Sequence, residues 1–192
     1  MTRILALDLS LTNAGVCRLL TWMGGWPVFE TETITVPPLR VPGARPGTRK
    51  NAPRTGADRL AWWRNWLSAD LHRNDYCMAV MEAPAMHGSG RVFDIGELYG
   101  VVKIMCYDRS LPLILVPPSS LKLYATGRGD SDKRRMIDTA VDTFGTQVRD
   151  EHQADAAWLC RMAAQADTAD WPSPETEYEQ KAIKALEVKG IL

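Results

Sequence analysis

Two carboxylates of this chain lie where carboxylates are costly. Asp8 interrupts the apolar stretch ILALDLSL at residues 4–11, and Glu82 ends the apolar stretch YCMAVME at residues 76–82. A buried carboxylate is expensive unless it is paired, hydrogen-bonded or bound to a metal. If the two stretches are neighbouring strands, Asp8 and Glu82 project close together. The alternative for each is an ordinary strand-end acid, with the Asp8 side chain capping the turn at residues 10–13.

A second acidic group opens the last long helical pattern. The segment DEHQADAAWLC contains Asp150, Glu151, His152 and Asp155, and the last two are three residues apart on one helical face. That face can oppose the strand carboxylates. The alternatives are again ordinary: Asp150 and Glu151 suit the first turn of a helix electrostatically, Asp155 is a solvated position, and His152 is a surface histidine.

Taken together, the acids predict metal chemistry. Clustered carboxylates repel one another unless a cation lies between them, and oxygen ligands favour Mg²⁺ or Mn²⁺. Two such ions about 4 Å apart can activate a water and stabilise the leaving oxygen of a phosphodiester. We therefore predict a site with two Mg²⁺ ions. The four cysteines are far apart with no C-x-x-C spacing, which argues against zinc.

Hydrophobic periodicity predicts the elements that position these side chains. Three strands, at residues 4–11, 15–22 and 28–36, are separated by short turns, as in an antiparallel meander. Further strands are expected at residues 76–82 and 112–116, and helices at residues 58–72, 91–108, 119–125, 131–144 and 151–166. The order β-β-β-α-β-α-β-α-α predicts an α/β domain with a mixed five-stranded sheet and helices on both faces.

The domain is expected to span residues 1–166, followed by an appendage at residues 167–192 in which Ser173-Pro174-Glu175 predicts a helix start. Residues 37–57 have no periodicity and are predicted to form a loop rich in Arg, Pro and Gly. The basic residues of that segment are Arg40, Arg45, Arg49, Lys50 and Arg54.

Bulk properties narrow the class of protein. The chain has 192 residues, of which 45% are hydrophobic, and its 23 basic residues balance 23 acidic ones. This suits one domain, and a neutral chain can still present a basic face. No apolar stretch of eighteen residues and no signal-peptide pattern is visible, which predicts a cytoplasmic protein without a membrane partner.

Five stretches, in order, resemble the successive motifs of RuvC-type Holliday junction resolvases, which belong to the ribonuclease H-like nucleases. They are LALDLSLTNAGV, AVMEAPA, DIGELYGVVKIM, VPPSSLKLYATGRGDSDKRRM and HQADAAWLC, and the resemblance covers roughly residues 4–166. The resemblance implies a ribonuclease H-like fold. It also implies a dimeric, Mg²⁺-dependent endonuclease, bacterial or phage-encoded, that nicks two strands of a four-way DNA junction.

The resemblance also assigns roles to residues. Asp8 and Glu82 match the first two carboxylates of the family, and His152 and Asp155 match its final pair, in which either Asp or His precedes the last Asp by three residues. His152 thereby joins the expected metal ligands, because a neutral imidazole can bind a metal or assist proton transfer.

Lys122 and Lys133 match lysines that contact DNA near the scissile phosphate, where cations stabilise developing charge. The alternative for TGRGDSDK is a turn followed by a helix cap. The residues that we assign to DNA binding are Lys122, Arg128, Lys133, Arg45, Arg49, Lys50 and Arg54.

The helix at residues 91–108 matches one that pairs with its own copy across a two-fold axis, which implies a homodimer. Its glycines, Gly96 and Gly100, are four residues apart. Their alternative role is to permit close packing of the helix on the sheet. The family often places an aromatic wedge after the second carboxylate, and Met86 and Phe93 are the candidates here.

Two other functions remain open from the sequence. DLSLTNAG resembles the first phosphate loop of actin-like sugar kinases and ATPases, although such chains are normally about twice as long. The second alternative function is a junction-binding protein that does not cleave DNA, and the complete set of acids argues against it. ATP binding separates the first of these from a nuclease, and nicking of a four-way junction separates the second.

Overall fold

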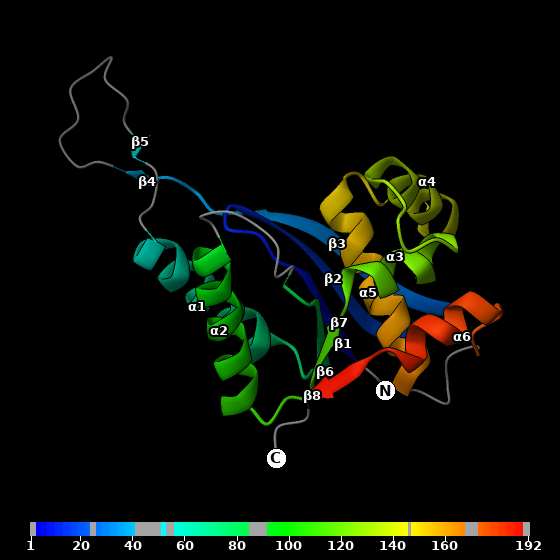
Figure 1. Ribbon diagram of the computed structural model, residues 1–192. Helices are drawn as coiled ribbons and strands as arrows, with labels where there is room; N and C mark the ends of the chain where they lie inside the picture. The colour runs from blue at the N-terminus through cyan, green and yellow to red at the C-terminus, as the bar shows by residue number, and fades with distance from the viewer. Residues whose placement is uncertain are drawn as a thin grey trace.

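A computed structural model describes residues 3–23, 26–40, 51–52, 56–84, 92–145, 147–167 and 173–189. In these ranges a twisted mixed sheet has helices on both faces (Figure 1). Its strands are β1 (Ile4–Asp8), β2 (Asn13–Met23), β3 (Trp26–Thr35), β6 (Met78–Glu82), β7 (Leu113–Val116) and β8 (Glu187–Lys189). Their spatial order is β3-β2-β1-β6-β7-β8.

The central pairing of the sheet brings the two carboxylate-bearing strands together. β1 pairs antiparallel with β2 on one side, and on the other it runs parallel to β6, with Leu7 opposite Met81. One step further along this register, Asp8 and Glu82 end adjacent parallel strands. The predicted meander and the predicted adjacency of the first and fourth strands are therefore confirmed.

The helices divide between the two faces of the sheet, as Figure 1 shows. α1 (Gly56–Arg73) and α2 (Val92–Asp108) cover one face. The other face carries α3 (Pro118–Thr126), α4 (Lys133–Phe144), α5 (Glu151–Asp167) and α6 (Glu177–Lys184). Each face buries its own apolar cluster, so both sides of the central strands are buried.

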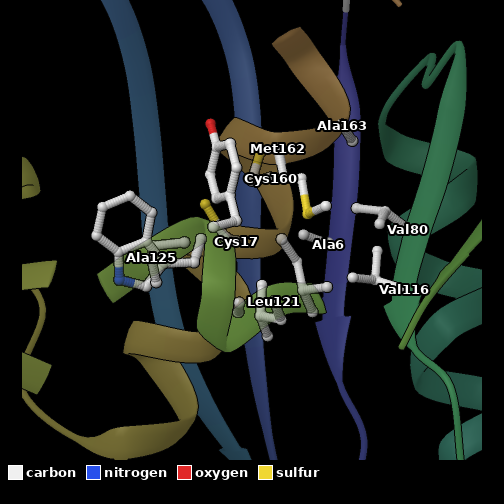
Figure 2. Close-up of a cluster of buried hydrophobic side chains, with 14 of the residues drawn as sticks. Ala6, Cys17, Val80, Val116, Leu121, Ala125, Cys160, Met162 and Ala163 are labelled. Atoms are coloured by element: carbon white, nitrogen blue, oxygen red, sulfur yellow. The ribbon is translucent and has the colours of Figure 1, made fainter. Parts of the chain in front are cut away.

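α5 lies directly on the sheet because small side chains line its inner face. Ala154, Ala156 and Ala157 are at most 1% exposed, and Ala163 is fully buried. Figure 2 shows strand residues of this cluster, among them Val80, facing residues of α3 and α5. The short side chains let the α5 backbone approach β1 and β2 closely, so the first turn of α5 is held beside the end of β1.

An ion-pair network centred on the buried pair of Arg18 and Asp70 fixes α1 to the opposite face. The Arg18 guanidinium on β2 donates to Asp70 on α1, with Nη2 2.7 Å from Oδ1, and its Nη1 lies 2.5 Å from Glu32 on β3. The Tyr76 hydroxyl also donates to Asp70, at 2.8 Å. Buried charges persist when they are paired and hydrogen-bonded in this way.

The C-terminal segment, which we predicted as an appendage at residues 167–192, contributes α6 and the sixth strand. β8 pairs antiparallel with β7, with Ile114 opposite Val188. The five predicted strands all belong to the sheet, and this additional edge strand was not predicted.

Residues 37–57, which we predicted as a loop, contain two short strands. β4 (Leu39–Arg40) and β5 (Asn51–Ala52) form a separate two-stranded sheet, which the lack of periodicity did not indicate. Two-residue strands carry too little pattern to be recognised. Among the described residues, no helix combines the length and apolar content needed to cross a bilayer.

Candidate active site

The predicted acids meet at one end of the sheet. Asp8 ends β1, Glu82 ends β6, and His152 and Asp155 lie in the first two turns of α5. The imidazole Nδ1 of His152 is 2.7 Å from Oδ2 of Asp8, and the Asp8 side chain is only 14% exposed. The structure therefore places residues 144 positions apart in the sequence in direct contact.

A glycine explains how closely α5 approaches the strands. Gly15 pairs with Asp8 across β1 and β2, and a Cβ built on it would lie 1.8 Å from the carbonyl oxygen of His152. Any other residue here would push the first turn of α5 away from the sheet. Gly15 was not among the predicted site residues, although it ends the motif that carries Asp8.

The first turn of α5 is also held from its N-terminal side. The Asp150 carboxylate accepts from the backbone N–H of Gln153 at 2.9 Å and from the hydroxyl of Thr33 on β3. Gln153 Nε2 lies 3.2 Å from the same hydroxyl oxygen. Asp150 therefore serves as a helix cap, which was the alternative considered for it.

The acids line a cavity of about 320 Å³. Lys122 on α3 and Lys133 at the start of α4 belong to its wall, so the structure brings both predicted lysines beside the acids. Its lining comprises Asp8, Glu82, Pro118, Leu121, Lys122, Lys133, Met136, Glu151, His152 and Asp155.

The acids perturb one another strongly. Burial raises the pKa of Glu82 to about 8, the negative charges of Asp8 and Asp155 add to the rise, and Lys122 opposes it. Burial likewise raises the pKa of Asp155 to about 7, with Asp8 and Glu151 adding to the rise. Because the pKa values of both carboxyl groups are raised by burial and by neighbouring negative charges, Asp8 among them, this site favours added positive charge.

His152 and Lys133 each have an acidic partner. The hydrogen bond between His152 and Asp8 raises the pKa of His152. The ammonium of Lys133 lies 2.8 Å from Oε2 of Glu151, and this contact raises the pKa of Lys133. Glu151 is thus a partner of Lys133 at the rim of the cavity, a role that the helix-start alternative did not include.

The donor set suits a hard divalent cation. Mg²⁺ binds through one or two carboxylates and keeps waters or phosphate oxygens in its remaining positions. Within the described ranges, no group of three or more His, Cys, Asp or Glu side chains is arranged to hold one ion. The predicted site with two Mg²⁺ ions therefore stays a prediction.

The other predicted DNA-binding residues are placed differently. Arg128 lies outside the cavity lining and pairs with Asp130 at 3.1 Å, with both side chains exposed. Four further basic residues that we assigned to DNA binding belong to residues 37–57 and lie outside the described residues, so their assignment stays a prediction. They are Arg45, Arg49, Lys50 and Arg54.

The wedge candidates and the glycines of α2 can be compared with the structure. Phe93 is 83% exposed near the start of α2, whereas Met86 lies outside the described residues. A Cβ on Gly96 or Gly100 would have no atom within 4 Å. The alternative that these glycines permit close packing on the sheet is therefore wrong, because they face open space.

The fold of this chain is similar to the folds of several solved structures. The structure of Thermus thermophilus RuvC in complex with a Holliday junction substrate matches with a TM-score of 0.63 and 15% identity, over 83% of this chain and 91% of that one. A second Thermus thermophilus RuvC structure matches with a TM-score of 0.61 and 16% identity, over the same shares. The yeast mitochondrial Holliday junction resolvase matches with a TM-score of 0.54 and 13% identity, over 95% and 80%.

At these identities the likeness concerns the fold, and it confirms the predicted ribonuclease H-like α/β architecture. No family model matches the chain, and neither does any curated protein.

Proposed function

We propose, from the fold that this chain shares with RuvC-type Holliday junction resolvases, that it is a divalent-metal-dependent endonuclease that cleaves branched DNA, with the four-way junction as its substrate. The observation that carries the proposal is the cavity at the ends of β1 and β6. Two strand-end carboxylates there face a histidine and an aspartate on α5, and two lysines complete the wall. This combination suits phosphodiester hydrolysis.

The acidic residues would hold the cation. Asp8, Glu82 and Asp155 are the proposed oxygen ligands, divided between two ions so that each ion takes one or two of them, and His152 is a further ligand or a proton carrier. Mg²⁺ or Mn²⁺ bound there, as a pair of ions, would lower the pKa of the attacking water and neutralise charge on the phosphate. Occupancy also requires loss of the protons that the raised pKa values of Glu82 and Asp155 retain near neutrality.

His152 adds a competition that an aspartate at this position would lack. In its protonated form the imidazole donates from Nδ1 to Asp8 and partly neutralises that carboxylate. A cation that takes Asp8 as a ligand therefore displaces or deprotonates His152. The proton released in this way is available within the cavity for the leaving oxygen.

The lysines supply the positive charge that a phosphate needs. Lys122 lies close enough to Glu82 to oppose the rise of its pKa, and Lys133 does the same for Asp155. A DNA strand that enters the cavity therefore meets two cations at its wall. Lys133 must exchange its contact with Glu151 for the phosphate, or bridge the two.

We further propose that the protein acts as a homodimer through α2. Phe93, Gly96, Gly100, Ile104 and Tyr107 follow one another at spacings of three and four residues, so they form one stripe along the helix. Ile104 is 55% exposed and Tyr107 is 56% exposed. An apolar stripe with two glycines at its centre suits the close approach of a second copy of the same helix, and a two-fold junction suits two symmetric active sites.

Nicking of a labelled four-way junction tests the proposal. We expect wild-type protein to nick the junction with Mg²⁺ and not in EDTA, and to cut linear duplex of the same sequence far more slowly. The Asp8→Asn variant should lose cleavage by about a hundredfold or more, because metal-ion stabilisation of the transition state is worth several kcal/mol. It should still bind the junction, because the substitution also removes repulsion of phosphate.

Asp142→Asn is the matched control, because Asp142 is an exposed residue of α4. This variant should cleave the junction at the wild-type rate. A wild-type protein that binds the junction without nicking it would favour a scaffold role. A protein that binds ATP in calorimetry and leaves the junction intact would favour the actin-like alternative.

A further inference from the structure

The C-terminal segment at residues 173–189 lies beyond the region that resembles the resolvases, yet it packs against the elements that carry the site. Figure 1 shows α6 beside α3 and α5. Ala182 on α6 is 1% exposed and belongs to the same buried cluster as Leu121 and Tyr124 on α3. The segment is therefore part of the folded domain rather than a separate tail.

One buried acid ties α6 to both neighbouring helices. Glu179 is 5% exposed, and its Oε1 accepts from Arg161 on α5 at 3.3 Å. Its Oε2 accepts from the backbone N–H of Thr176 at 3.0 Å, which completes a capping box at the start of α6. The Arg161 guanidinium in turn lies over the ring of Tyr124 on α3, 5.9 Å from its centroid. A charge buried in this way fixes the position of α6.

A tyrosine on the same helix covers the C-terminal end of α3. Gly127 caps α3 with a φ of +76°, and its backbone N–H bonds to the carbonyl of Leu123. A Cβ built on Gly127 would lie 3.6 Å from Cε1 of Tyr178 on α6. The Tyr178 ring, which is 38% exposed, therefore lies beside the residue where α3 stops and the chain turns toward α4.

A pair of hydroxyl groups joins the end of α3, which carries Lys122, to the residues just before Lys133. Thr126 Oγ1 donates to the carbonyl of Lys122 at 2.7 Å and lies 2.6 Å from the hydroxyl of Ser131. Ser131 is 6% exposed and stands two residues before Lys133. The loop also folds back on α3, because a Cβ on Gly129 would lie 3.1 Å from the carbonyl of Ser119. These contacts thus tie α3, the loop and the start of α4 to one another.

We infer that α6 is a positioning element for the cavity, in which the Tyr178 ring beside Gly127 limits where α3 can end and thereby sets where α3 and the following loop hold Lys122 and Lys133. The inference rests on the proposed function for the role of the two lysines. Tyr178 touches no residue of the cavity lining among the contacts that the structure describes, so it acts through α3 and is a positioning residue.

Four single variants isolate this role. Tyr178→Ala removes the ring, Tyr178→Phe keeps it, and Gln180→Ala changes an exposed residue of the same helix; Lys122→Ala removes the lysine itself. The readout is single-turnover cleavage of the four-way junction at saturating protein, beside the Kd for the junction. We expect Tyr178→Ala to lower the cleavage rate roughly tenfold with an unchanged Kd, because a small misplacement of a charge is costly at the reacting phosphate. Tyr178→Phe and Gln180→Ala should match wild type.

A double-mutant cycle separates positioning from a general loss of structure. Adding Tyr178→Ala to the Lys122→Ala, Lys133→Ala pair should cause little further loss, because the residues through which Tyr178 acts are already gone. A full tenfold loss on that background, or a Tyr178→Ala variant with the wild-type rate, would overturn the inference.

Hydrogen exchange gives a readout that does not depend on cleavage. We expect faster exchange in Tyr178→Ala at the last turn of α3, residues 123–127, and unchanged exchange in α2. If wild-type protein fails to nick any junction, the proposed function is wrong, whereas unchanged exchange in α3 overturns the positioning role by itself.

Discussion

At the scale of single residues, the cavity contains buried carboxyl groups whose negative charges repel one another. Glu82 and Asp155 both have raised pKa values, about 8 and about 7, chiefly through burial. The folded protein therefore keeps protons on these groups at a pH where the unfolded chain has released them. At neutral pH and above, these two groups therefore lower the stability of the fold, and a cation bound beside them would offset that loss.

The first prediction concerns the pH dependence of stability without metal. A carboxyl group with a folded pKa of about 8 and an ordinary value of 4.5 stabilises the fold fully below pH 4.5, and this contribution is lost as the pH rises through 8. Glu82→Gln should therefore remove part of the fall in unfolding free energy between pH 5 and 8, by up to about 1.4 kcal/mol per pH unit.

Urea unfolding in EDTA at several pH values measures this effect. Mg²⁺ should restore stability to the wild-type protein at pH 8 and have little effect on Glu82→Gln. Identical pH profiles for the two proteins would show that Glu82 is not buried beside other charges.

The second prediction concerns His152. His152→Asp should keep appreciable cleavage, because a carboxylate can also bind the cation, and its activity should no longer depend on release of the Asp8–His152 hydrogen bond. His152→Ala should lose most activity. Junction cleavage across a Mg²⁺ titration distinguishes the two. If both variants cleaved the junction at the wild-type rate, His152 would be an ordinary surface residue with no part in cleavage.

At the scale of elements, the position of α5 depends on the absence of a side chain at Gly15. The carbonyl of His152 occupies the space that a Cβ would fill, and alanines on the inner face of α5 allow the same close approach along the helix. Because His152 and Asp155 both belong to the first turns of α5, any displacement moves both relative to Asp8.

Gly15→Ala should therefore destabilise the protein by about 1–3 kcal/mol, the usual cost of overpacking, and should reduce cleavage further than stability alone explains. Gly56→Ala is the matched control, because a Cβ there would meet no atom within 4 Å. Urea unfolding and single-turnover cleavage measure the two effects. Equal behaviour of both variants would mean that α5 can shift without cost.

The sequence predicted most elements of the fold because their periodicity is strong, as in residues 4–11 and 151–166. It also predicted that Asp8 and Glu82 would be neighbours, which needs only the adjacency of two strands. It did not predict β8, because EVK at residues 187–189 is too short to show alternation and is strand only through pairing with β7. Tertiary context decides such segments.

The contacts within the cavity were less predictable than its composition. That His152 would bond to Asp8, and Lys133 to Glu151, depends on the angle and depth at which α5 meets the sheet. Gly15 sets that depth, and a glycine in a strand motif has no side-chain pattern that would indicate such a contact.

At the scale of the whole molecule, the outward face of α2 combines exposed apolar side chains with open glycines. Large apolar side chains are usually covered when they gather on one stripe of a helix. Phe93, Ile104 and Tyr107 all lie on this stripe, on the side of α2 away from the sheet.

Ile104→Glu should therefore convert a dimer into the 21.4 kDa monomer, because a carboxylate at a self-complementary contact meets its own copy. Sedimentation measures the mass, and Thr143→Glu on α4, an exposed position away from α2, is the control. The monomeric variant should also lose the paired nicks of a junction. A wild-type protein that sediments as a monomer would refute the proposed role of α2.

The contact between Asp8 and His152 can form only late in the synthesis of the chain. Its partners are 144 residues apart, so a ribosome produces the first strand long before the helix that completes the cavity. Contacts of such high sequence separation form late and slow the folding of a domain. A nascent or prematurely terminated chain that lacks α5 has no complete set of acids. The cavity that we propose as the active site therefore exists only once the last long helix, α5, has been synthesised and folded onto the sheet.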